Sequence, residues 1–379
     1  MKKKLSILTL SLFSGGAERV ISLFLEPLSK DFDVTLVLMY NKINYEIPKN
    51  IKIKLLLPDE DYQTANFYNL KNLYKMSNVY SKFIKAEGID ISLSFLVLPN
   101  LLNSITKIKN KTLTTIISER NFPSVAYKFK KSSYIIAKTF FPTLYNRNDK
   151  LFSNSVYINK DLKENFGVKI PMSVIYNPIM IYDDKKIKNI SSDIVLNIIN
   201  VGSFKPQKNH KMIFEPLSNC NQEEYALSII GRGTLENELK SNVEELNLKN
   251  VTFLGYQKNV RDYLVQNDVF VLSSSAEGFP NVLLEALSVG LPIISTNCNS
   301  GPLEMLNTNE PVQIKEGEFY LAKYGILINT DDALALASAL NFLKENIEMR
   351  RKYSEQGLIR AKDYELSKIY KDLKALLDT

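Results

Sequence analysis

The sequence predicts an α/β protein made of two doubly wound, Rossmann-like domains. A chain of 379 residues is too long to form one ordinary hydrophobic core and is about the right length for two domains. Short apolar, β-branched runs alternate with helical stretches, as in the βαβ units of parallel sheets. The alternation stops at Asn177-Pro178 and the polar segment 183–193, and then resumes. We therefore expect a first domain over residues 1–182, a second over 183–360, and a C-terminal helix over 361–379 that packs back toward the first.

The first half of the chain begins with three lysines and a short apolar run that leads into Gly15-Gly16. Because no small-residue cleavage site follows, we expect a buried strand rather than a signal peptide. No apolar run approaches the roughly 20 residues that span a bilayer. The expected helices of this half are 17–29 and 67–87. The expected strands are 5–10, 34–39, 51–57, 91–95, 113–118, 150–153 and 172–176.

A second series of strands and helices follows the polar segment. Its expected strands are 195–201, 226–230, 251–254, 269–272, 292–295 and 325–328, and its expected helices are 235–247, 281–289 and 333–346. Ligands of doubly wound sheets bind beyond the carboxyl ends of the strands. We therefore expect the two sheets to face each other across a cleft that holds the site.

Residue counts exclude several kinds of site. Cys220 and Cys298 form no CxxC pair, so a disulfide framework or a zinc site is not expected and a reducing compartment fits. His210 is the only histidine, which excludes a histidine-rich metal site, and we expect it to be structural rather than catalytic.

The charge is distributed unevenly: residues 1–180 hold 26 Lys and Arg against 14 Asp and Glu, whereas residues 181–379 hold 22 against 27. The excess of positive charge in the first half therefore indicates that one lobe binds an anionic partner, such as a membrane or a lipid-linked diphosphate. A nucleic acid is not favoured, because no nucleic-acid-binding motif occurs.

The strongest chemical signal lies at residues 269–286, where a buried strand runs into the sequence AEGFPNVLLEA. Free backbone N–H groups at the start of a helix near Pro280 bind phosphate well. Glu277 precedes this helix and Glu285 lies inside it, so that two carboxylates flank the helix end and suit sugar hydroxyls. Two surface glutamates around an ordinary helix start are the alternative.

These residues resemble the E-x7-E signature of glycosyltransferase family 4, which has the GT-B fold of two Rossmann-like domains. The other matching segments, in the family's order, are Gly15-Gly16-Ala17-Glu18-Arg19-Val20, Val201-Gly202 with Lys208-Asn209-His210, Ile230-Gly231-Arg232-Gly233, Phe253-Leu254-Gly255-Tyr256 and Ser300-Gly301-Pro302-Leu303-Glu304. The segment Asn44–Pro48 also resembles the N-acetylgalactosamine transferases of Campylobacter-type lipid-linked oligosaccharide assembly.

The resemblance implies catalytic roles for two residues. Glu277 would bind hydroxyls of the transferred sugar and support its oxocarbenium-like transition state, and Lys208 would neutralise the leaving diphosphate. The implied donor-binding positions are Gly16, Ser203, Arg232, Tyr256, Gly278, Phe279, Asn281, Val282 and, for the ribose, Glu285. The implied acceptor-binding positions are Gly15, Glu119 and Arg120. Family members retain the anomeric configuration without a protein nucleophile, and the resemblance implies no metal or other cofactor.

The chain departs from the family pattern at two positions. Ser203 stands where many members have arginine, and Lys205 or Arg232 are candidates to replace it. Arg120 stands where many have histidine; it could bind a phosphate or acceptor carboxyl group, or be a plain surface arginine.

Two weaker signals stay open. Asp59-Glu60-Asp61 fits the D-x-D pattern by which a different glycosyltransferase fold holds a metal ion, but it also reads as a solvated loop. Aromatic, aliphatic and lysine residues interleave over 127–141, as in a helix that lies on an anionic membrane or packs on its own sheet.

We therefore expect a cytoplasmic transferase on the inner face of the membrane. It would move a sugar, an N-acetylhexosamine by the resemblance, from a UDP-sugar to a polyprenyl-diphosphate saccharide. A sugar-nucleotide epimerase of the same fold and a non-catalytic scaffold remain alternatives.

Overall fold

The computed structural model describes residues 2–13, 15–57, 70–126, 131–182 and 195–378. It forms two compact units, which are considered separately: unit 1 contains residues 1–178 and 366–379, and unit 2 contains residues 179–365. The division after Pro178 falls at the Asn177-Pro178 break in the sequence pattern. Proline restricts the residue before it to extended conformations and ends regular structure there.

Unit 1 is built on a seven-stranded sheet in which every strand pair is parallel. Its spatial order is β3 (Lys52–Leu55), β2 (Asp33–Leu38), β1 (Lys4–Thr9), β4 (Ile91–Phe95), β5 (Thr114–Glu119), β6 (Lys150–Ser153) and β7 (Met172–Val174). The central strands are almost completely buried, which explains why they read as continuous apolar runs. The chain order reverses between β1 and β4.

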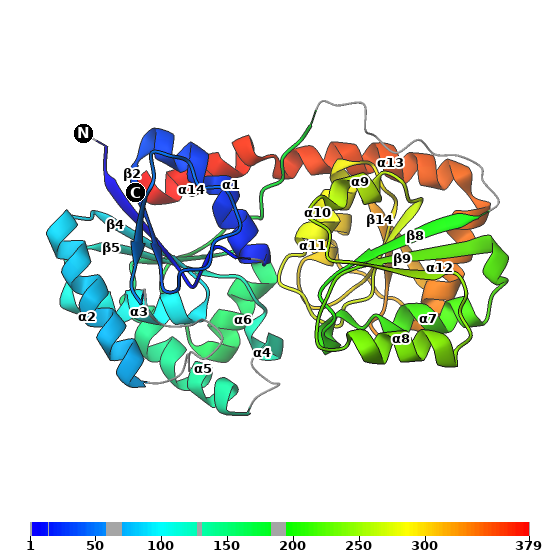
Figure 1. The fold of residues 1–379 in the computed structure, drawn as a ribbon, viewed down its shortest axis with the longest axis horizontal. Coiled ribbons are helices and arrows are strands. Elements are labelled where there is room, and N and C mark those ends of the chain that lie inside the picture. Colours follow the sequence, from blue (N-terminus) through cyan, green and yellow to red (C-terminus); the bar gives the residue numbers. More distant parts are fainter. Residues whose placement is uncertain (1, 14, 58–69, 127–130, 183–194, 379) are drawn as a thin grey trace. The chain divides into compact units, whose positions relative to one another are not determined.

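Helices cover both faces of this sheet (Figure 1). One face carries α1 (Gly16–Asp31) and the C-terminal helix α14 (Leu366–Asp378), which are in contact. Tyr370 of α14 donates a hydrogen bond to the Pro27 carbonyl of α1 at 3.0 Å. The other face carries α2 (Leu70–Glu87), α3 (Val97–Lys109), α4 (Pro123–Ala126), α5 (Lys131–Leu144) and α6 (Val156–Phe166).

Unit 2 contains a second seven-stranded sheet. Its order is β10 (Val251–Gly255), β9 (Tyr225–Ile230), β8 (Leu196–Val201), β11 (Val269–Leu272), β12 (Ile293–Thr296), β14 (Gly325–Ile328) and β13 (Phe319–Ala322). All pairs are parallel except β13 with β14. The prediction of two doubly wound α/β domains is therefore confirmed.

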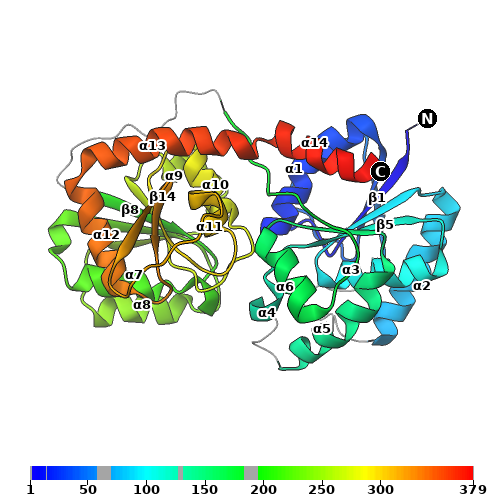
Figure 2. The same cartoon turned by 180° about the vertical axis from the view of Figure 1, so that it is seen from behind.

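The helices of unit 2 also lie on both faces of their sheet (Figure 2). On one face lie α7 (Lys211–Ser218), α8 (Glu236–Glu245) and α12 (Ala333–Glu345). On the other lie α9 (Val260–Leu264), α10 (Asn281–Ser288), α11 (Pro302–Asn307) and α13 (Ile347–Ala361). The core packs inward-facing residues of the sheet against α7, α8 and α12.

Several predicted boundaries differ from the observed ones. The third strand is shorter than the expected 51–57, and its residues are largely exposed because β3 is the edge strand. The antiparallel strand β13 was not expected, because its four residues lie within a stretch rich in charged and glycine residues. In the described residues, no helix is long and apolar enough to cross a membrane.

Candidate active site

The chain order of unit 2 reverses between the neighbouring parallel strands β8 and β11. From β8 the chain proceeds to β9 and β10 on one side, and from β11 to β12 on the other. The crevice outside the carboxyl ends of such a strand pair is the usual ligand site of a doubly wound sheet. Two loops lie there: residues 202–210 follow β8, and residues 273–280 follow β11.

Each of these loops contributes one member of an ion pair. Lys208 Nζ lies 2.5 Å from Glu277 Oε1, with 23% of the lysine side chain and 11% of the glutamate side chain exposed. The Ser274 hydroxyl donates a second hydrogen bond, of 2.6 Å, to the same carboxylate oxygen. The two predicted catalytic residues, 69 positions apart in sequence, are thus in direct contact.

Backbone and hydroxyl contacts tie the two loops together. The Ser275 amide donates to the Gln207 carbonyl at 2.8 Å, and the Ser273 hydroxyl donates to the Lys208 carbonyl at 2.8 Å. These contacts fix the backbone beneath both charged side chains, so that the ion pair does not depend on two freely moving loops.

Helix α10 begins directly after this loop, with Pro280 as its N-cap. The predicted positions Asn281, Val282 and Glu285 lie on α10 and are half-buried. The Phe279 side chain is buried against Tyr364, with ring centroids 5.6 Å apart. Its ring therefore belongs to the core, and what it can present to a ligand is its backbone.

The loop after β12 braces the start of α10. The Ser300 hydroxyl donates to the Gly278 carbonyl. Gly301 has φ +92°, and a Cβ atom at this position would lie 2.6 Å from Pro280 Cδ. The close approach and the left-handed backbone both require glycine here.

The predicted donor residues Arg232 and Tyr256 follow β9 and β10. The Arg232 guanidinium carbon lies 4.6 Å from the centroid of the Tyr256 ring, and that tyrosine is 55% exposed. Ser203 lies in the loop after β8, five residues before Lys208, and the amide of its neighbour Phe204 donates to the Arg232 carbonyl at 3.0 Å. The three positions therefore occupy connected loops at one edge of the sheet.

His210 is buried beside Lys208, and its ring packs edge-on against Phe204 with centroids 5.1 Å apart. Burial, followed by the charge of Lys208, lowers the pKa of its imidazole to about 4. A neutral, enclosed ring is consistent with the structural role expected for His210.

The two cysteines of the chain, Cys220 and Cys298, are free thiols, and Cys298 is buried.

In unit 1 the predicted positions Gly15 and Gly16 form the start of α1 and are exposed. The Glu18 carboxylate folds back over this helix end: a Cβ atom on Gly15 would lie 2.3 Å from Glu18 Oε2. Burial raises the pKa of the Glu18 carboxyl group above its usual value. The absence of a side chain at Gly15 therefore leaves room for the Glu18 carboxylate in this position.

Glu119 is the last residue of strand β5 and Arg120 follows it; both belong to a buried polar network. Glu119 accepts hydrogen bonds from the Tyr145 hydroxyl at 3.1 Å and from the Arg120 amide at 3.1 Å. The Arg120 guanidinium donates to the Asn177 side chain and lies near the ring of Phe95, 5.8 Å from its centroid. Arg120 is 6% exposed, so its interpretation as a plain surface arginine was wrong. Its burial lowers the pKa of the guanidinium to about 9.

Some predictions fall outside the described residues. These are the possible D-x-D site at Asp59-Glu60-Asp61, the polar segment 183–193 and the start of the segment 127–141. In the described part of α5, Phe141 is buried, Tyr134 and Phe140 pack against the same core cluster, and Ile135 is 56% exposed. Among the residues the structure describes, no group of three or more His, Cys, Asp and Glu side chains is arranged to hold a metal ion.

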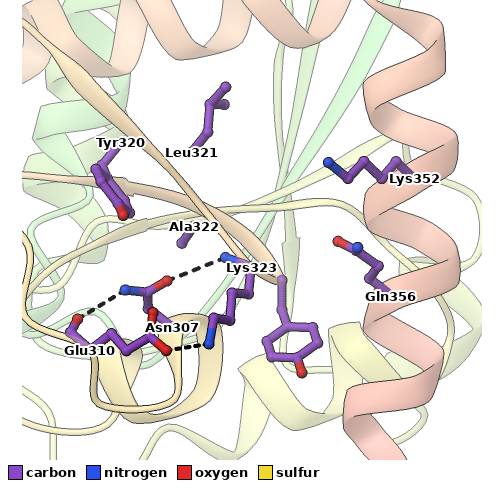
Figure 3. Close-up of a pocket in the computed structure, with 9 residues that line it drawn as sticks. Asn307, Glu310, Tyr320, Leu321, Ala322, Lys323, Lys352 and Gln356 are labelled. Atoms are coloured by element: carbon purple, nitrogen blue, oxygen red, sulfur yellow. Dashed lines mark hydrogen bonds and ion pairs between the residues drawn. The ribbon is translucent and has the colours of Figure 1, made fainter.

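A shallow pocket of about 410 Å³ lies elsewhere in unit 2 (Figure 3). It is formed by the β13–β14 hairpin, the end of α11 and side chains of α13, including Lys352 and Gln356. Lys323 pairs with Glu310 along its wall. Because the pocket adjoins the beginning of β14, it lies at the opposite sheet edge from Lys208 and is not part of the candidate site.

Comparison with known proteins identifies the family. The model of "Glycosyl transferases group 1" matches residues 183–360. A Campylobacter jejuni N-acetylgalactosamine-N,N'-diacetylbacillosaminyl-diphospho-undecaprenol 4-alpha-N-acetylgalactosaminyltransferase is 31% identical, over 99% of this chain and 100% of its own. The chain belongs to the group 1 glycosyltransferases. A second C. jejuni enzyme, an alpha-1,4-N-acetyl-D-galactosaminyltransferase named for a GalNAc-alpha-(1->4)-GalNAc-alpha-(1->3)-diNAcBac-PP-undecaprenol, is 26% identical over 99% of this chain and 98% of its own.

Solved glycosyltransferase structures share the fold. Anabaena HepE, solved with UDP and glucose, superposes with a TM-score of 0.77 at 17% identity, covering 99% of both chains. The lipopolysaccharide outer core galactosyltransferase WaaB superposes with a TM-score of 0.73 at 22% identity, covering 98% of both. The glycosyltransferase therefore has the GT-B fold expected from its sequence.

One residue of the candidate site was not identified by the sequence analysis. Ser274 is 1% exposed and contacts the Glu277 carboxylate directly. The run Ser273-Ser274-Ser275 at the end of a buried strand was the available signal, because polar residues that directly follow such a strand fall at the ligand edge of the sheet. Which of three serines bonds the carboxylate depends on the loop conformation.

Proposed function

We propose that this chain is a retaining, family 4 enzyme that transfers an N-acetylhexosamine from a UDP-sugar to a polyprenyl-diphosphate-linked saccharide. The observation that carries the proposal is the Lys208–Glu277 pair, 2.5 Å apart at the β8–β11 reversal and directly before α10. The nature of the acceptor is supported by the names of the two C. jejuni relatives, and the donor nucleotide by the UDP in the HepE structure.

The ion pair suits the charge changes of glycosyl transfer. As the bond to the sugar breaks, negative charge grows on the diphosphate and positive charge on the sugar ring. Lys208 would turn to the diphosphate, while the Glu277 carboxylate would remain with the sugar, accepting hydrogen bonds from its hydroxyls and stabilising the positive ring. Donors placed in advance where charge develops supply a large part of catalysis.

Other groups of unit 2 would hold the donor. The amide end of α10 suits the diphosphate, because a helix N-terminus favours negative charge. Glu285 on α10 would accept hydrogen bonds from the ribose, and the exposed Tyr256 ring beneath Arg232 offers a surface for the uracil. Lys208 and this helix end carry positive charge of their own, so we propose that transfer needs no metal ion.

In unit 1, Gly15, Glu119 and Arg120 would contribute to acceptor binding. Arg120 is the group best suited to an acceptor phosphate, because its buried guanidinium is held by the neutral Asn177 side chain and by aromatic rings. A buried cation is costly even beside a neighbouring carboxylate such as Glu119, and an anionic ligand offsets part of that cost.

The proposal also places the enzyme at an anionic membrane surface on the cytoplasmic side. The lysine-rich segment 127–141 and the exposed Ile135 of α5 support it, together with the positive charge of residues 1–180. Co-sedimentation with vesicles of phosphatidylglycerol, compared with phosphatidylcholine, tests this part. Equal binding to both, or wild-type binding by Ile135→Asp, would contradict it.

The central experiment incubates the protein with a panel of UDP-sugars and an undecaprenyl-diphosphate saccharide, followed by mass and NMR analysis of the product. We expect one added N-acetylhexosamine in the α configuration, with EDTA leaving the rate unchanged. No transfer and no hydrolysis of any donor would refute the proposal. Epimerisation of the UDP-sugar in the absence of an acceptor would indicate an epimerase. An absence of UDP binding in calorimetry would indicate a non-catalytic scaffold.

A further inference from the structure

Ser274 is fixed from two directions beside the Glu277 carboxylate. Its hydroxyl, with the residue 1% exposed, donates to Glu277 Oε1 at 2.6 Å. Its carbonyl accepts a hydrogen bond of 2.6 Å from the Thr296 hydroxyl at the end of β12. Because Thr296 is fully buried on a central strand, the position of the Ser274 backbone is set by the sheet.

Both donors to this carboxylate bind the same oxygen. Lys208 Nζ and the Ser274 hydroxyl meet Oε1, and within the described part of the chain no group donates to Oε2. The arrangement leaves Oε2 as the oxygen able to accept a hydroxyl of the sugar. Because the two oxygens belong to one rigid carboxylate, the hydrogen bonds to Oε1 also determine the direction in which Oε2 points.

The two donors respond differently to a diphosphate. Lys208 is a cation on a flexible stem, with 23% of its side chain exposed, so a diphosphate competes with Glu277 for it. Ser274 is short and enclosed, and its backbone is held by Thr296, so its hydroxyl cannot follow a diphosphate as the long lysine side chain can. Once Lys208 turns away, the hydroxyl of Ser274 is the donor that remains on Oε1.

We infer that Ser274 is a positioning residue that keeps the Glu277 carboxylate in place while Lys208 moves to the leaving diphosphate. The inference rests on the proposed function, since it names the group that holds the carboxylate during transfer. The inference also explains why a hydroxyl lies next to an existing ion pair. Without Ser274, the Glu277 carboxylate would lose its only holding contact among the described residues when Lys208 moves to the diphosphate.

Kinetics of three variants test the inference. We expect Ser274→Ala to lower kcat about 10- to 100-fold, as for the loss of a hydrogen bond to a charged group, with the donor KM little changed. Ser274→Thr keeps a hydroxyl and should recover most of the rate. Ser295→Ala is the control, because Ser295 is equally buried and its hydroxyl bonds the Thr296 carbonyl. A wild-type kcat for Ser274→Ala, or a loss confined to KM, would overturn the inference.

Crystal structures separate this inference from the proposed function. With UDP bound, Lys208 should leave Glu277 while the Ser274–Glu277 hydrogen bond remains; a Ser274 hydroxyl turned away from a stationary carboxylate would contradict the inference. If UDP does not bind and no donor is turned over, the proposed function fails. Ligand-free structures of the wild type and Ser274→Ala then decide, because an identical Glu277 rotamer in both would show that Ser274 does not position it.

Discussion

The two units each place a glutamate at the end of a central parallel strand, but they hold it in opposite ways. Glu277 follows β11, is 11% exposed, and pairs with a flexible lysine from another loop. Glu119 ends β5, is fully buried, and is bonded by Tyr145 and a backbone amide. The lysine can leave its carboxylate, whereas an enclosed tyrosine and an amide of the same loop cannot without unfolding part of the unit.

This difference teaches that topological position alone does not make a reactive carboxylate. Both strand ends lie beside or near the reversal of chain order in their sheets. A carboxylate becomes available to a ligand where its partner is mobile and partly exposed. We expect Glu277 to be catalytic, and Glu119 to contribute to acceptor binding indirectly, by organising the network around Arg120.

Removing Glu277 should give the largest effect. Glu277→Ala should lower kcat by about 100- to 1,000-fold, because it deletes a group that stabilises charge in the transition state. Its melting temperature should stay near that of the wild type, since the carboxylate is not part of the core. Steady-state kinetics and a thermal melt measure both, and activity within twofold of wild type would end the assignment.

Acidification should destabilise unit 2 through His210. The pKa of about 4 in the folded protein lies below the ordinary 6.5, so between these values the unfolded chain binds a proton that the folded chain does not. The associated stability is complete above pH 6.5 and is lost as the pH falls toward 4. Wild type should therefore lose on the order of 3 kcal/mol more than His210→Gln between pH 7 and 4. Urea unfolding of both proteins at pH 7 and pH 4 measures this difference. Equal losses of unfolding free energy in the wild type and in His210→Gln would disprove the prediction.

The locked network of unit 1 predicts an effect on stability rather than on chemistry. Tyr145→Phe removes the hydroxyl that donates to Glu119 and should cost about 1–3 kcal/mol, because a buried carboxylate loses one of its hydrogen-bond donors. The donor KM should not change. If Tyr145→Phe instead reduced kcat as strongly as Glu277→Ala, the contrast between the two glutamates would be wrong.

The smallest expected effect concerns the exposed pair of Arg232 and Tyr256. Exposed cation–π contacts contribute only about 0.5–1 kcal/mol. Tyr256→Ala should accordingly raise the donor KM about two- to fivefold with kcat nearly unchanged. Calorimetry with UDP provides the matching affinity, and undiminished binding would remove both residues from the donor site.

The sequence by itself determined the class of fold and the residues of the ion pair. Alternating apolar runs specify strands and helices through local periodicity, and the break at Asn177-Pro178 is a local property of proline. Glu277 and Lys208 were identified through spacing and resemblance, which also depend on sequence alone.

Only the tertiary structure decided what each of these side chains touches. That Lys208 reaches Glu277, that Ser274 rather than its neighbours bonds the carboxylate, and that Arg120 is buried all follow from loops brought together by the parallel pairing of distant strands. Contacts between residues 69 or 57 positions apart are set by strand order and register, which no local pattern records. The edge strand β13 escaped prediction for the same reason, because its partner β14, rather than its own composition, makes it a strand.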